Sequence, residues 1–302
     1  MKTVRFLPLL LALCIGQALA DTPINLQHAA SPNARISVSN VKGQVTITAW
    51  DRNQVQVTGT LGEGAAPLAI EGSNDDLEIK VKPKDDGSHG WFNWHGDNSM
   101  GDTSLELHVP KGASLDVDVV SAPLGIDGMD GGNISVNSVS GRVRIDARTP
   151  DLSVESVSGT VQQSGHAERA DLQTVSGDIL APALGSQADL QTVSGRIQAT
   201  GGPWQKFNLS TVSGDVQLNG GVAGHGSIDI DSMSGDVQIM VPADLSASIH
   251  ASSFSGDLRS DFGQAVEHDH GPGSELNAEV GGSNGRIHVE TFSGDLRIRK
   301  KD

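Results

Sequence analysis

The chain has 302 residues, of which 36% are hydrophobic and 3% aromatic, and its 37 acidic and 21 basic side chains give a formal charge of −16. Such acidity argues against nucleic acid and against anionic lipid surfaces as partners, because both attract basic patches. The only cysteine, Cys14, lies in the N-terminal apolar segment. The rest of the chain therefore has no thiol for a disulfide, a zinc thiolate site or a cysteine nucleophile.

Residues 1–20 are predicted to be a secretory signal peptide. The segment begins with the basic MKTVR, continues with the apolar FLPLLLALCIG and ends with the small-x-small motif ALA. Its apolar run is too short to span a bilayer, and no later segment is apolar enough to do so. Cleavage would remove Lys2 and Arg5 and lower the formal charge from −16 to −18. We therefore expect an exported protein, periplasmic or on the cell surface, with no transmembrane segment in the mature chain.

Three stretches in the first third alternate between apolar and polar residues, as strands with one buried face do. They are residues 54–58, 77–81 and 105–109, at irregular spacing. We expect them to form an irregular β-rich region, residues 21–116, that joins the main fold. Such a region would cap one end of the fold and protect it from edge-to-edge aggregation.

A long aromatic loop, residues 85–102, joins the second and third of these strands. It contains two of the four tryptophans together with one phenylalanine and two histidines, namely His89, Trp91, Phe92, Trp94 and His95. The simpler interpretation is a plug that folds its aromatic rings over an open end of the sheet. The alternative is a ligand site, because long loops often carry function.

An internal repeat dominates the rest of the chain. The pattern Ser/Thr-x-Ser-Gly-x-Val/Ile/Leu occurs eight times, and LQTVSG is written identically at 172–177 and 190–195. The motif glycines lie at 141, 159, 177, 195, 214, 235, 256 and 294. Two weaker copies precede them, at 36–47 and at 117–126, the second with Leu124 in place of the glycine. A period near twenty residues is typical of a solenoid.

The apolar positions of each repeat fall into two sets of opposite parity. The first set lies seven and five residues before the glycine, as in Ile134 and Val136, and predicts a strand with one inward face. The second set lies two before, two after and four after the glycine, as in Val212, Val216 and Leu218. One straight strand cannot bury both sets, so the chain must bend at the Ser/Thr three before the glycine. We expect two short strands per coil, with Val212, Val216 and Leu218 buried.

The residue after each motif glycine has outward parity and is predicted to form a row along one edge of the stack. The row consists of Arg142, Thr160, Asp178, Arg196, Asp215, Asp236, Asp257 and Asp295. A solvated charged edge is the preferred interpretation. A calcium ladder is the alternative, although one carboxylate per coil supplies few of the oxygens that calcium needs.

The doubled spacing of 38 before the last glycine indicates an insertion at about 261–285. Residues 275–280 and 286–290 flank GGSNG and predict a hairpin. The insertion contains His268-Asp269-His270, which we interpret as a surface loop, with a metal site as the alternative. His250 and His288 have outward parity and are expected to be exposed; they would stack if the insertion loops out between adjacent coils.

These features together predict an all-β fold. We expect a single-chain parallel β-solenoid of two-strand coils, each about 18–21 residues long, because the repeats stack like strands beside like strands. The predicted boundaries are a signal peptide at 1–20, the β-rich cap region at 21–116 and the solenoid repeats at 117–302.

Several of these motifs resemble a bacterial envelope family, the putative-adhesin family of β-strand-repeat proteins with a domain of unknown function. The resemblance rests on Trp50-Asp51 before an alternating strand, on Val109-Pro110 and Val241-Pro242, and on the serial SGD coils. It covers nearly the whole mature chain. It implies an exported, right-handed β-solenoid linked to adhesion or to cell-envelope stress, and it brings no catalytic residues.

The sequence shows no nucleophile elbow, HExxH motif or phosphate-binding loop. We therefore expect a non-enzymatic, adhesin-like scaffold or interaction module without a cofactor, whose partner is an envelope protein or a glycan. The alternative is a β-helix that binds or cleaves carbohydrate. That function needs converging carboxylates and usually aromatic platforms, and the chain has no tyrosine.

Overall fold

A computed structural model of the chain describes residues 22–84, 100–264, 266–267 and 273–301. This part of the chain contains 23 strands and no helix, which confirms the all-β prediction. The predicted signal peptide lies outside the described residues. The strands are β1 (Thr22–Ala29), β2 (Arg35–Trp50), β3 (Gln54–Leu61), β4 (Ile70–Ser73), β5 (Asp76–Lys80), β6 (Thr103–Pro110), β7 (Ser114–Ser121), β8 (Leu124–Asp130), β9 (Ile134–Ser140), β10 (Val143–Ser158), β11 (Val161–Ser176), β12 (Ile179–Ser194), β13 (Ile197–Gly201), β14 (Trp204–Ser213), β15 (Val216–Asn219), β16 (Val222–Ser234), β17 (Val237–Pro242), β18 (Ala247–Ser255), β19 (Leu258–Ser260), β20 (Val266–Glu267), β21 (Ser274–Val280), β22 (Gly285–Ser293) and β23 (Leu296–Lys301).

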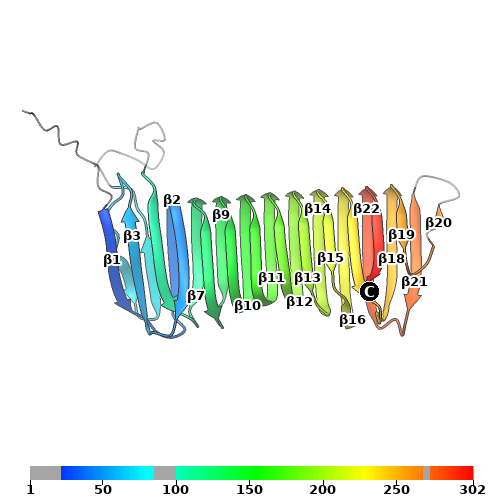
Figure 1. Ribbon diagram of the computed structural model, residues 1–302, viewed down its shortest axis with the longest axis horizontal. Helices are drawn as coiled ribbons and strands as arrows, with labels where there is room; N and C mark the ends of the chain where they lie inside the picture. The colour runs from blue at the N-terminus through cyan, green and yellow to red at the C-terminus, as the bar shows by residue number, and fades with distance from the viewer. Residues whose placement is uncertain (1–21, 85–99, 265, 268–272, 302) are drawn as a thin grey trace, which may run out of the picture.

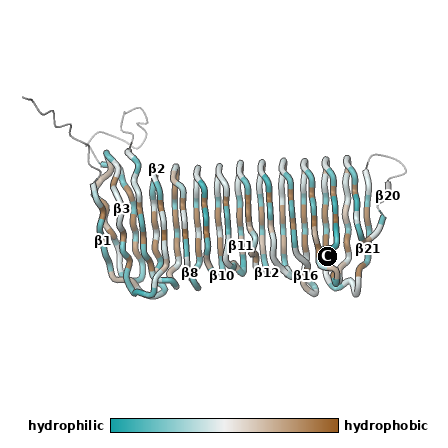
Figure 2. The backbone as a smooth tube through the Cα atoms, viewed as in Figure 1, coloured by the Kyte–Doolittle hydropathy of each residue, from teal (hydrophilic) through white to brown (hydrophobic). Residues whose placement is uncertain are grey.

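The strands form an elongated stack of coils, in which each coil lies against the next (Figure 1). Through the middle of the stack the pairing is parallel and in register: Val154 lies opposite Leu172, and Leu172 lies opposite Leu190. Equivalent side chains therefore lie one above another, and the inward ones form one continuous core. Figure 2 shows these apolar segments recurring from coil to coil.

Antiparallel strands close both ends of the stack. At the N-terminal end β1 pairs with β3, β3 pairs with β6, and β4 pairs with β5, all antiparallel. At the C-terminal end β21 pairs antiparallel with β18, and β20 pairs antiparallel with β21. These strands occupy the edges that a parallel stack would leave open, and an open edge is a site of aggregation.

The order of coils in space differs from their order in the chain near the C-terminus. β22 pairs in parallel with both β16 and β18, and β23 pairs in parallel with both β17 and β19. The last coil is thus inserted between two earlier ones. The predicted hairpin of residues 275–280 and 286–290 is wrong, because β21 and β22 lie on opposite edges of β18. Ile287 and Val289 carry the coil pattern and join the core instead.

The corner of each coil differs from its prediction at one position. Val216 and Leu218 are buried and Asp215 and Gln217 are exposed, as expected, but Val212 is 45% exposed. The same holds for Val139 and Met233, which were assigned to the same inward set. The physical reason is that the strand keeps its inward parity through the Ser/Thr three before the glycine. The chain then turns over the next four residues.

The motif glycines lie at this corner rather than inside the second strand. A Cβ on Gly159, where φ is +122°, would lie 2.0 Å from the carbonyl oxygen of Gly141 on the adjacent coil. Glycine is therefore required because the corners stack backbone against backbone. In the repeat at 117–126 the glycine position is held by Ala122, not by Leu124 as predicted. Ser121 pairs with Ser140, which places Ala122 beside Gly141.

Candidate interaction surface

Ten apolar side chains protrude from the corners in one line along the stack, and we call this line the exposed apolar row. Their exposed fractions run from 42% to 58%, and every large apolar side chain that is exposed in the described part of the chain belongs to the row. In spatial order the row consists of Val41, Val120, Val139, Val157, Val175, Val193, Val212, Met233, Phe292 and Phe254.

The backbone of the corner aims these side chains outward. In the coil at 172–179, Leu172 and Thr174 are buried, Val175 and Ser176 are exposed, and Ile179 is buried again. Because side chains of a strand alternate between its two faces, Val175 must point out as long as Thr174 points in. The row therefore follows from the strand geometry of every coil.

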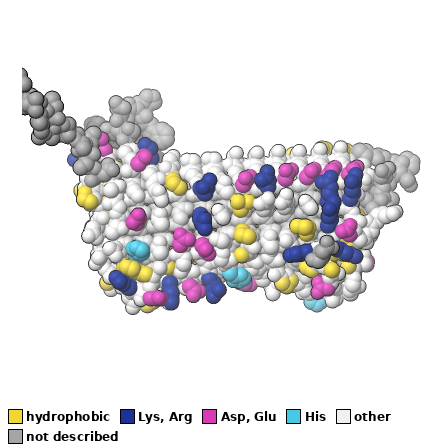
Figure 3. Space-filling model, viewed as in Figure 1, with side chains coloured by type: hydrophobic (Ala, Val, Ile, Leu, Met, Phe, Trp, Pro, Cys, Tyr) yellow, Lys and Arg dark blue, Asp and Glu magenta, His cyan; other side chains and the backbone are white. Residues whose placement is uncertain are grey.

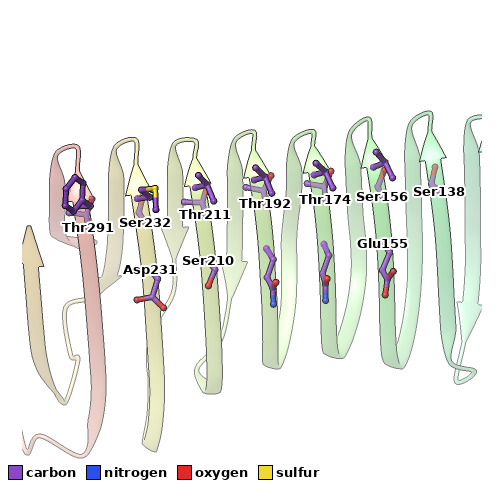
Figure 4. Close-up of a pocket in the computed structure, with 18 of the residues that line it drawn as sticks. Ser138, Glu155, Ser156, Thr174, Thr192, Ser210, Thr211, Asp231, Ser232 and Thr291 are labelled. Carbon is purple, nitrogen blue, oxygen red and sulfur yellow. The ribbon is translucent and has the colours of Figure 1, made fainter.

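A groove runs beside the row and crosses nine coils. Its volume is about 1530 Å³. The exposed apolar row from Val120 to Phe254 forms one side, and a row of polar side chains two residues earlier in each strand forms the other. This polar row consists of Asp118, Asn137, Glu155, Gln173, Gln191, Ser210, Asp231, Glu290 and Ser252. Figure 4 shows the two lines on successive coils.

Buried hydroxyls lie between the two rows. They belong to the Ser/Thr three before each glycine, and Figure 4 places them at the same height from coil to coil. The hydroxyls of Thr174, Thr192 and Thr211 have no hydrogen-bond partner among the described residues, whereas the Ser156 hydroxyl donates to the Ser158 carbonyl at 3.4 Å. All eight copies hold Ser or Thr at this buried position, whereas the aligned residue of the repeat at 117–126 is Val119.

The groove is acidic. Its described lining includes four carboxylates and no lysine, arginine or histidine. Asp118 accepts a hydrogen bond from the Asn137 amide at 2.9 Å, and Glu290 lies 3.1 Å from Nε2 of His288, just outside the groove. Glu155 and Asp231 have no hydrogen-bond or ion-pair partner in the described part of the chain. Two carboxylates, four coils apart, are therefore free to meet a cationic group.

Aromatic rings occur at one end of the exposed apolar row. Phe254 and Phe292 stack with centroids 4.7 Å apart and an interplanar angle of 8°. The pair follows from the inserted last coil, because β22 places Phe292 directly beside Phe254. The C-terminal end of the row is thus broader and more apolar than its valine-lined middle.

The row after the motif glycines points outward, as predicted, and has a structural role that the sequence did not indicate. The Asp178 carboxylate accepts the backbone N–H of Arg196 at 2.9 Å, and Asp236 accepts that of Asp295 at 3.1 Å. Arg297 also lies 2.6 Å from Asp295 and 3.7 Å from Asp236. Figure 3 shows acidic and basic side chains mixed along the upper edge of the molecule. Four of the five aspartates thus each accept a backbone N–H of the adjacent coil, and nearby arginines relieve the repulsion.

The two outward histidines stack, as expected if the insertion loops out between coils. The rings of His250 and His288 are 5.1 Å apart and nearly parallel, at 3°. Both are half-buried, and Nδ1 of His250 lies 2.6 Å from Oδ1 of Asn277 on β21. Within the described ranges, no group of three or more His, Cys, Asp or Glu side chains is placed to hold a metal ion.

Two predicted candidate sites lie outside the described residues. They are the aromatic loop with His89, Trp91, Phe92, Trp94 and His95, and the His268-Asp269-His270 segment. Both stay predictions. In the part of the chain that is described, no helix is long and apolar enough to cross a membrane.

The family described as Toastrack DUF4097 matches residues 33–299. The chain belongs to this family. The matched segment contains the whole exposed apolar row of this Toastrack protein. This match confirms the expected membership of a family with a domain of unknown function.

Solved structures from three bacteria are similar to the Toastrack chain. A putative adhesin from Bacteroides fragilis is 14% identical with a TM-score of 0.42, covering 93% of this chain and 98% of that one. A putative adhesin from Parabacteroides merdae is 11% identical with a TM-score of 0.43, covering 92% and 99%. A structure titled putative lipid binding protein, from Parabacteroides distasonis, is 14% identical with a TM-score of 0.41, covering 93% and 97%. No curated protein matches the chain.

Proposed function

We propose that this Toastrack protein is an exported, non-enzymatic interaction module of the bacterial cell envelope, adhesin-like in its action, which binds its partner along the exposed apolar row. In this proposal the coils form a right-handed parallel solenoid that acts as a rigid scaffold, located in the periplasm or at the cell surface. The observation that carries it is that every exposed large apolar side chain of the described chain lies in one row.

Exposure of the apolar row to water costs free energy. Full burial of a valine, methionine or phenylalanine side chain is worth about 1.5–3 kcal/mol, and half of each member of the row is in water. Apolar residues scattered singly over a surface are normal, whereas a contiguous apolar patch marks an interaction site. Nine steps of about 4.8 Å give the row a length of roughly 43 Å. A partner that covers it would recover much of this free energy.

A rigid scaffold suits this role. The Val154, Leu172 and Leu190 positions stay in register across coils, so the exposed apolar row is straight and its spacing is fixed by the backbone ladder. A preformed surface loses little conformational entropy on binding, because its side chains are already ordered. The stacked glycines and the Asp-to-amide hydrogen bonds at the same corners hold the row in place.

Carbohydrate binding or cleavage is the second candidate function. Asp231 and Glu290 lie opposite each other on adjacent coils, and the Phe254–Phe292 stack offers an apolar platform nearby. A glycosidase pair, however, flanks the scissile bond from two sides. These two carboxylates lie on one side of the groove and the apolar row on the other. This arrangement favours binding over cleavage.

Site-directed photo-cross-linking in intact bacterial cells that produce the protein tests the proposal. A photoreactive phenylalanine analogue replaces Val175 in the exposed apolar row or, as the matched control, the exposed Gln217 on the second strand of another coil. We expect an adduct of one defined mass from position 175 and none from position 217. Equal adducts from both positions, or none from either, would contradict the proposed function. An adduct that a glycosidase treatment removes would support the carbohydrate candidate instead.

A further inference from the structure

We infer that the partner of the groove is a cationic amphipathic α-helix, which lies along the stack with its apolar stripe on the exposed apolar row and its basic flank over the polar row. This inference rests on the proposed function, since it names the chemistry of the partner that the row would bind. Three features of the groove lead to it: its charge, its spacing and its lack of free backbone groups.

The charge of the groove selects a basic partner. Four carboxylates and no basic side chain line the described groove, and the whole chain has a formal charge of −16. The carboxylates of Glu155 and Asp231 have no partner in the described structure, so they gain most from a lysine or arginine. A second copy of this chain would bring like charges together, and an anionic lipid surface would be repelled.

The spacing of the coils suits a helix better than an extended chain. Adjacent coils are about 4.8 Å apart, so the row offers one apolar side chain at each such step. A helix laid along the row has a pitch of about 5.4 Å and presents one turn to each coil. A strand laid in the same direction presents side chains on one face only every 6.6 Å or so.

The backbone under the groove also favours a helix over an extended chain. The backbone groups of the strands under the groove are used in the parallel ladders between coils. The edges of the stack are occupied by antiparallel strands, as at β21 and β18. A buried extended peptide would therefore find few backbone partners, whereas a helix satisfies its own N–H and C=O groups. Helix-in-groove binding is a common mode of peptide recognition.

The positions of the free carboxylates specify the partner further. Glu155 and Asp231 are four coils apart by the chain of parallel registers. Four steps of about 4.8 Å give roughly 19 Å. The nearest whole number of helical turns is four, which spans about 22 Å, or about 14 residues, and places both basic clusters on the same flank of the helix. The inferred helix therefore carries two basic clusters about four turns apart on one flank of its apolar stripe. Glu290, on the coil next to Asp231, would add a second acidic contact at that end.

A peptide titration tests this inference with the full chain. The probe is a fluorescein-labelled 24-residue helical peptide with a leucine stripe and two lysine clusters four turns apart, and binding is followed by fluorescence anisotropy. Control peptides carry glutamate in place of lysine, or the same composition in scrambled order. We expect saturable binding of the basic helix only, with an affinity that falls as the salt concentration rises.

Protein variants locate the contact. The double variant Glu155→Gln with Asp231→Asn should bind the basic helix about 5-fold more weakly or worse, because it removes two ion pairs. The matched control, Glu106→Gln with Asp127→Asn, changes two exposed carboxylates outside the groove and should leave the affinity unchanged. Equal affinity of both double variants, or equal binding of the basic and acidic helices, would overturn the inference.

The remaining outcomes separate this inference from the function on which it rests. If the basic helix does not bind but the cross-linker at Val175 still gives its adduct, the partner chemistry is wrong and the proposed function stands. If neither occurs, the proposed function fails as well. Binding to vesicles of phosphatidylglycerol and phosphatidylcholine, or a dimer in sedimentation that Val175→Asp abolishes, would replace the helix by a membrane or by a second copy.

Discussion

Replacing Val216 by aspartate tests the register of the fold, with Val212→Asp as its matched control. The two valines are four residues apart in the same repeat, yet Val216 is 1% exposed and Val212 is 45% exposed. Val216 pairs with Ile197 and Val237 on the adjacent coils, inside the continuous core. Val212→Asp changes a side chain that is already half in water.

The magnitudes follow from these burials. Val216→Asp loses a burial worth about 1.5–3 kcal/mol and also places an unpaired charge in an apolar stack, so we expect a total cost of about 4 kcal/mol or more. Val212→Asp should cost less than about 1 kcal/mol, as surface substitutions do.

Thermal unfolding followed by far-ultraviolet circular dichroism measures both changes. At about 2–4 °C per kcal/mol for a chain of this size, Tm should fall by roughly 10 °C for Val216→Asp and by about 4 °C at most for Val212→Asp. Equal losses for the two variants would refute the placement of the corner. A stable Val216→Asp variant would refute the register of the second strand.

Three further predictions concern the corners. Gly159→Ala should destabilise the fold by about 2–4 kcal/mol in urea unfolding, because its Cβ would overlap the Gly141 carbonyl. The control Gly125→Ala, which has open space around it, should cost less than about 1 kcal/mol. Similar costs for the two variants would contradict the backbone stacking. Asp236→Ala should cost about 1 kcal/mol by removing the acceptor of the Asp295 amide, and Asp236→Asn, which keeps an acceptor, should cost less; the reverse order would show that charge matters more than the hydrogen bond. Millimolar calcium should leave Tm unchanged, because the row after the motif glycines offers at most one carboxylate per coil and calcium needs about six oxygens or more. A rise in Tm of several degrees that is lost in the Asp236→Asn variant would support the calcium ladder.

The inward positions of the coils could be predicted from the sequence because the repeat samples them many times. Ile134 and Val136, and their equivalents in later copies, recur with period two and are all buried. Val216 and Leu218 do the same after the glycine. Hydrophobic periodicity is a reliable signal where one face is buried, since a one-residue slip would expose every apolar side chain of that strand.

The exposed apolar row could not be predicted by the same reasoning, because that reasoning assigns apolar residues to the inside. Val175, two residues before its glycine, was placed inward because it shares the parity of the buried apolar residues after the glycine, although its neighbour Thr174 continues the inward parity of Leu172. One signal was available. Four residues lie between Thr174 and Ile179, so the change of parity can occur anywhere within Val-Ser-Gly-Asp, and that allows the valine to point outward.

The spatial order of the last coils also could not be predicted from the sequence. The spacing of 38 indicated an insertion, yet nothing in it specifies that β22 enters between β16 and β18. Pairing between strands is non-local and depends on which edges are free, so local hairpin signals can be overruled. The Phe254–Phe292 stack and the His250–His288 stack are both consequences of this order.

One measurement tests the central claim, that the exposed apolar row serves a partner and not the fold. The triple variant Val157→Thr, Val175→Thr and Val193→Thr keeps the shape of the row and makes its middle polar. A photo-cross-linker is placed at Gln173 in the groove, both in the otherwise unchanged chain and in the triple variant. The account predicts that the unchanged chain forms an adduct and that the triple variant forms none, while the Tm of the triple variant stays within a few degrees. An adduct that persists in the triple variant, or a collapse of Tm, would contradict it.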